Sequence, residues 1–132
     1  MFHKAFATTV LLAGAATLAT LPAFAADVGA EITTAAMHAG LAAQAGNIEG
    51  VHTHLHHTVN CLVGPNGAGF DAKQLNPCAN SGNGAIPDAT NNATKQALQA
   101  ALAKANSGLA SSDLPTAQKD AAETESDLKA IK

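Results

Sequence analysis

The sequence predicts an all-α fold: a small four-helix bundle made of two helical hairpins joined by a long loop that a disulfide ties back. Residues 27–63 and 88–132 are rich in alanine and contain few helix breakers, which indicates helices. Residues 64–87 are rich in glycine and contain three prolines, which is typical of a loop. Each helical half carries turn residues near its middle, so each is expected to fold back on itself.

The first helical half is predicted to turn at Gly46-Asn47. Asparagine is a favoured N-cap, so a second helix is expected over residues 48–62, and Gly64-Pro65 suits its end. The alternative is one unbroken helix over about residues 31–62, which would give a three-helix bundle. A seven-residue recurrence supports this alternative, formed by Leu41, Ile48, Leu55 and Leu62.

The second helical half is predicted to start at Asp88, which follows Pro87. Asn106-Ser107-Gly108 is expected to end its first helix. Ser112 or Asp113 then caps the last helix, with Pro115 in the first turn. That helix has an apolar seam at spacings of three and four, formed by Leu114, Ala117, Ala121, Leu128 and Ile131.

The N-terminus has the pattern of an export signal. Lys4 gives a positive start, an apolar stretch follows, and Ala23-Phe24-Ala25 places small residues at a cleavage position. We therefore expect residues 1–25 to be a signal peptide and residues 26–132 to be one helical domain. The expected location is the periplasm of a Gram-negative bacterium, with no membrane attachment once the signal is cleaved.

The composition argues against a nucleic-acid partner. The net charge is −3, the lysines are scattered, and arginine, tryptophan and tyrosine are absent. Beyond the signal, Phe70 is the one aromatic ring on which a base could stack.

Two cysteines, Cys61 and Cys78, flank part of the loop. In an exported chain they are expected to form one disulfide, worth about 3 kcal/mol by the chain-entropy argument. The alternative is a pair of free thiolates that bind a metal. Covalent haem is excluded because the motif of two cysteines and a histidine is absent.

The stretch HTHLHHTVNC, residues 52–61, contains four of the six histidines. On a helix, His52 and His56 are one turn apart and share a face, and Glu49 precedes them on the same side. If the chain turns at Gly46-Asn47, His38 faces this pair. Three nitrogens and a carboxylate oxygen would then suit Cu(II), with Zn(II) or Ni(II) as alternatives.

The other two histidines of this stretch, His54 and His57, project away from that predicted face. They are expected to form a second, weaker surface site or none. A carboxylate-bridged two-metal site would need a second E-x-x-H motif, which only a symmetric dimer would supply.

These features resemble those of small histidine-rich metal-binding proteins of the bacterial periplasm. The resemblance rests on Met37-His38-Ala39, the alanine-rich approach to Gly46-Asn47, and residues 52–57. It implies a four-helix bundle that binds or buffers divalent metals, copper foremost. The second half lacks histidine, and the loop NCLVGPNGAGFDAKQLNPC instead looks like the signature of a separate exported proteobacterial family.

The predicted function is therefore non-catalytic metal binding in the periplasm, since no recognisable motif sets a nucleophile beside a base. One alternative is non-covalent haem binding with His52 or His56 as axial ligand, for which the alanine-rich core offers a poor pocket. The other is an envelope interaction module whose histidines respond to pH.

Overall fold

The computed structural model describes residues 25–131, and all regular structure in that range is helical. Four long helices form the bundle: α1 (Val28–Gln44), α2 (Ile48–Val63), α4 (Asn92–Ala110) and α5 (Leu114–Ala130). A short helix, α3 (Ala85–Asp88), precedes α4. The predicted all-α bundle of two hairpins is thus confirmed.

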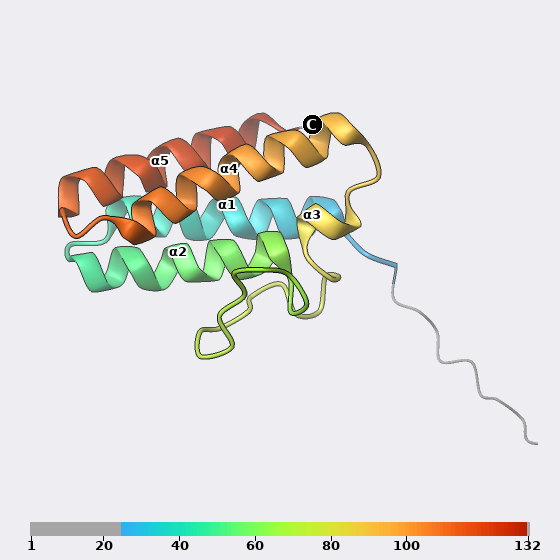
Figure 1. Cartoon of the computed structure of the whole chain (residues 1–132), viewed down its shortest axis with the longest axis horizontal. Helices are drawn as coiled ribbons and strands as arrows, with labels where there is room; N and C mark the ends of the chain where they lie inside the picture. The colour runs from blue at the N-terminus through green and yellow to red at the C-terminus, as the bar shows by residue number, and fades with distance from the viewer. Residues whose placement is uncertain (1–24, 132) are drawn as a thin grey trace, which may run out of the picture.

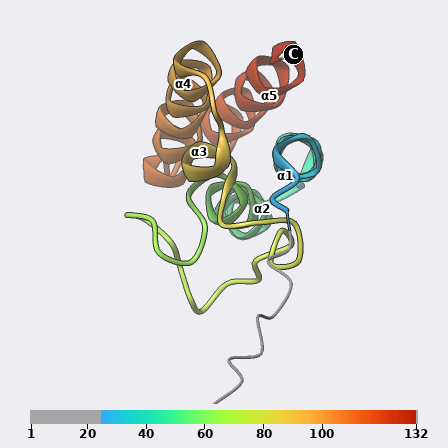
Figure 2. The ribbon, with the colours of Figure 1, turned by 90° about the vertical axis from the view of Figure 1, so that its right-hand side faces the viewer.

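The two hairpins form two layers, with α1 and α2 in one and α4 and α5 in the other (Figure 1). Seen from the end, the helices follow one another around the bundle in the order α1, α2, α4, α5 (Figure 2). Small side chains allow these helices to approach closely, and alanine makes up much of the buried interior. The largest buried apolar side chains are Leu55, Leu62, Leu98 and Leu128.

The first hairpin turns where the sequence predicts. Helix α1 ends at Gln44, and the Asn47 side chain accepts a hydrogen bond of 2.8 Å from the backbone N–H of Gly50. This bond satisfies one of the free N–H groups that begin α2. The alternative of one unbroken helix over residues 31–62 is therefore wrong.

The loop after α2 is held against that helix by a covalent bond and by one asparagine. Gly64 ends α2 with φ +68°, and the predicted disulfide between Cys61 and Cys78 is confirmed. The buried Asn60 side chain donates to the carbonyls of Asp71 and Leu75 and accepts from the Asp71 N–H. These bonds replace the regular structure that a loop of this length lacks.

The start of the second hairpin differs from the prediction. Helix α4 begins after Asn91, whose side chain accepts from the Thr94 N–H, whereas Asp88 ends α3 and accepts from the Asn83 N–H. Asparagine and aspartate are about equally favourable N-caps, so Asn91 can cap α4 in place of the predicted Asp88. Of the two predicted caps of α5, Asp113 is the one used, through a bond from the Thr116 N–H.

Asn106-Ser107-Gly108 does not end the helix, because α4 continues to Ala110. Gly108 is buried, and a Cβ added there would come within 2.7 Å of Leu55 Cδ1. The Ser107 hydroxyl donates to Asp120 of α5 over 2.8 Å. Ser107 and Gly108, two of the three residues that suggested a break, therefore serve contacts between helices.

The predicted export signal, residues 1–25, lies outside the described residues except for Ala25. Of the helices within residues 25–131, none combines the length and the apolar character needed to cross a membrane.

Candidate metal site

The turn at Gly46-Asn47 lays α1 antiparallel to α2 and so brings His38 to the second helix. The Thr58 hydroxyl donates to the Ala35 carbonyl of α1 over 3.2 Å, which fixes the side of α2 that α1 covers. Thr58 is fully buried at this contact. On a helix with 3.6 residues per turn, His54 lies one turn before Thr58 and therefore also faces α1.

Three histidines meet at this contact: His38 of α1 with His54 and His57 of α2. One ring nitrogen from each lies within 4.8 Å of those of the other two. The Nδ1 atoms of His38 and His54 are 3.4 Å apart. The His57 ring stands edge-on to the other two, with its centroid 5.0 Å from that of His38 and 5.7 Å from that of His54. Side-chain nitrogens this close could hold one metal ion between them.

Burial keeps part of this group neutral. Burial, together with the neighbouring His57 and His54 rings as smaller causes, lowers the pKa of His38 from its ordinary value of 6.5 to about 4. Burial also lowers the pKa of His57, with His54 and His56 as further causes. A neutral imidazole keeps a lone pair on one ring nitrogen, and that lone pair is what a metal ion binds.

One nitrogen of the group has no partner. The Nδ1 atom of His57 is enclosed and makes no hydrogen bond with any described residue. A buried polar atom without a partner costs free energy, which a ligand to this nitrogen would offset. Between His38 and His54 a weak N–H···N hydrogen bond can form in one tautomer.

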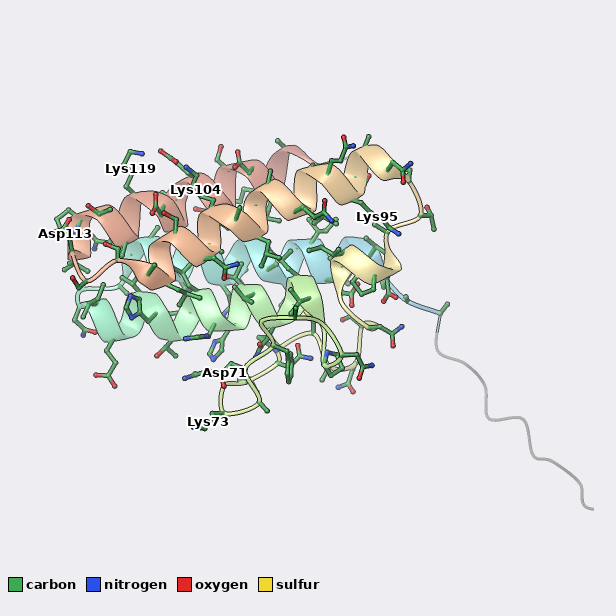
Figure 3. The ribbon with its side chains drawn as sticks, viewed as in Figure 1. Asp71, Lys73, Lys95, Lys104, Asp113 and Lys119 are labelled. Carbon is green, nitrogen blue, oxygen red and sulfur yellow. A yellow bond between two sulfur atoms is a disulfide. The ribbon has the colours of Figure 1, made fainter. Side chains whose placement is uncertain are left out.

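The other predicted ligands do not join His38, and the expectation that His38 faces His52 and His56 is wrong. His52 Nε2 donates to the Ser111 carbonyl, 2.9 Å away at the end of α4. His56 Nδ1 lies 3.6 Å from a carboxylate oxygen of Asp71 in the loop below α2 (Figure 3). Glu49 is exposed in the first turn of α2. In the described chain, the group close enough to hold a metal contains histidines alone.

The four histidines of α2 form two pairs, His54 with His57 and His52 with His56, which lie on opposite flanks of the buried stripe of this helix. That stripe runs through Val51, Leu55 and Leu62. At 100° per residue, His54 and His57 fall on the flank toward α1, and His52 and His56 on the flank toward α4. The sequence places the stripe but not the side on which α1 packs, so either pair fits a hairpin. A signal for the observed site was present, because a spacing of three also sets His54 and His57 on a shared side.

No protein-family model, curated protein or solved structure matches this chain.

Proposed function

We propose that this protein is a non-catalytic, periplasmic binder or buffer of a divalent transition metal, and that His38, His54 and His57 supply the ligands. The observation that carries the proposal is the approach of three imidazole nitrogens, from two helices, to within 4.8 Å of one another. Clustering of this kind is costly for protonated rings, and the lowered pKa values of His38 and His57 favour the metal-binding form.

Imidazole ligands suit Cu(II), Zn(II) and Ni(II). The general order of affinity favours Cu(II), and an exported protein meets whichever ion its surroundings supply. The export pattern of residues 1–25 supports a periplasmic role, as does the resemblance to histidine-rich periplasmic proteins around Met37-His38-Ala39. A binding role rather than a catalytic one is proposed because no recognisable motif of the sequence sets a nucleophile beside a base.

Calorimetric titration of the chain without residues 1–25 by Cu(II), Zn(II) and Ni(II), each in turn, tests the proposal. We expect one ion per chain for at least one metal. His38→Ala should weaken that binding by about tenfold or more, since one of three ligands is lost. Helical circular dichroism of the variant serves as the folding control.

Two results would count against the proposal. One is the absence of heat and of any metal-induced rise in melting temperature for all three ions. The other is tight binding that His38→Ala leaves unchanged in a folded variant.

A further inference from the structure

The spacing of His38 and His54 carries information about coordination geometry. Their Nδ1 atoms are 3.4 Å apart. With metal–nitrogen bonds of about 2.0–2.1 Å, two ligands of a tetrahedral ion are about 3.3–3.4 Å apart, whereas neighbouring ligands of a square-planar ion are about 2.8–3.0 Å apart. The His38–His54 pair therefore has the spacing of two ligands of a tetrahedral ion, the geometry typical of Zn(II). The His57 nitrogen lies within 4.8 Å of the other two ligand nitrogens and joins them by a side-chain movement.

The number of ligands is also informative. A tetrahedral ion has four positions, and the group in the described residues supplies three imidazoles and no carboxylate. Structural zinc sites are closed by four protein ligands, whereas three protein ligands leave one position open. Because neutral imidazoles do not cancel the charge of a divalent ion, that open position favours an anionic donor.

The open position is within reach of solvent. His38 and His54 are half-buried rather than enclosed. His57 is the most protected of the three at its Nδ1 atom. A small ligand can thus approach from the exposed side while the helices α1 and α2 keep their packing.

From these three observations we propose that the site binds Zn(II) in tetrahedral geometry, with a fourth position occupied by an exchangeable small anion or by a donor atom of another molecule. This inference rests on the proposed function and deepens it. It implies that an acceptor can bind the ion before the histidines release it. The rate of metal transfer to the acceptor then rises with acceptor concentration and is not limited by spontaneous dissociation of the ion.

Co(II) provides the test, because it takes the same site geometry as Zn(II) and reports it through visible absorption. We expect the Co(II)-loaded protein to show the intense visible bands of four-coordinate Co(II). We expect sodium azide to shift these bands by occupying the fourth position, and excess Zn(II) to abolish them. A weak spectrum typical of six-coordinate Co(II), or bands that azide does not change, would overturn the inference.

The matched variants are His57→Ala and His56→Ala, which change neighbouring residues on the two flanks of α2. His57→Ala should lose the intense bands, and His56→Ala should retain them. If none of Cu(II), Ni(II), Zn(II) and Co(II) binds the unmodified protein, the proposed function fails. If Cu(II) or Ni(II) binds but Zn(II) and Co(II) do not, only the inference fails. If both ions bind but the spectrum is six-coordinate, only the inference on geometry fails.

Discussion

The Nδ1 atoms of His38 and His54 lie 3.4 Å apart although sixteen residues separate them in the chain. A single helix over this range would separate the two residues by about 24 Å along its axis at 1.5 Å per residue. The contact therefore depends on the turn at Gly46-Asn47. The histidine group can therefore form only when the first hairpin forms.

The metal-free protein should lose stability as the pH falls. The folded pKa of His38 is about 4, below the ordinary value of 6.5. Between these values the unfolded chain binds a proton that the folded chain does not, so stability present above about pH 6.5 is lost toward pH 4. We expect the melting temperature to fall over this range, by about 4 °C or more.

Carboxylates also bind protons in this range, so variants are needed to isolate the imidazole contribution. His38→Gln should reduce the pH dependence of the melting temperature relative to that of the unmodified protein. Equal slopes for the unmodified protein and His38→Gln would show that His38 does not contribute.

Gly64 is expected to tolerate no side chain. Its φ of +68° and ψ of 174° fall in a region almost confined to glycine, and an added Cβ would overlap the carbonyl oxygen of Asn83. Gly64→Ala should lower the free energy of unfolding by about 2 kcal/mol or more, measured by urea denaturation.

Gly46→Ala is the matched control for Gly64→Ala, since a Cβ added at Gly46 meets no atom within 4 Å. Gly46→Ala should change the free energy of unfolding by no more than about 0.5 kcal/mol. Equal effects of the two substitutions would contradict the account of how α2 ends.

The buried Glu31 should destabilise the protein at neutral pH. Burial raises the pKa of this carboxyl, as do Asp88 and Asp27, while the hydrogen bond from the Gly84 N–H acts in the opposite direction. Its second oxygen has no partner among the described residues. Glu31→Gln keeps an acceptor for Gly84 and removes the charge, so the melting temperature at about pH 7 should rise by about 4 °C.

The gain from Glu31→Gln should shrink as the pH falls, because the protonated carboxyl no longer carries the charge. Glu31→Ala should instead lower the melting temperature, since it leaves the Gly84 N–H unpaired and opens a cavity. A Glu31→Gln variant as unstable as Glu31→Ala would show that the charge itself is needed.

Most of the fold could be predicted because its signals are local. The caps at Asn47 and Asp113 and the glycine at the end of α2 each follow from the residue and its neighbours. The pairing of Cys61 with Cys78 follows from the presence of two cysteines in a chain that is expected to be exported. The continuation of α4 past Gly108 could not be predicted from local sequence. That glycine is explained by its close contact with Leu55, which lies 53 positions earlier in the chain. Local sequence does not distinguish a helix stop from a close helix contact.

The candidate site could be predicted in kind but not in detail. The histidine-rich stretch and the turn that brings His38 to it were both visible in the sequence. The choice between His54 with His57 and His52 with His56 depends on which flank of α2 receives α1. That choice is settled by packing among all four helices, which no pattern within α2 records.

The comparison of the two flanks of α2 is the most direct test of the central claim. Metal titration should be carried out on two double variants, His54→Ala with His57→Ala and His52→Ala with His56→Ala, after both are shown to fold. The account predicts that the first double variant loses the bound ion and that the second binds it within about threefold of the unmodified affinity. Loss of binding in the second variant, with binding retained in the first, would contradict it.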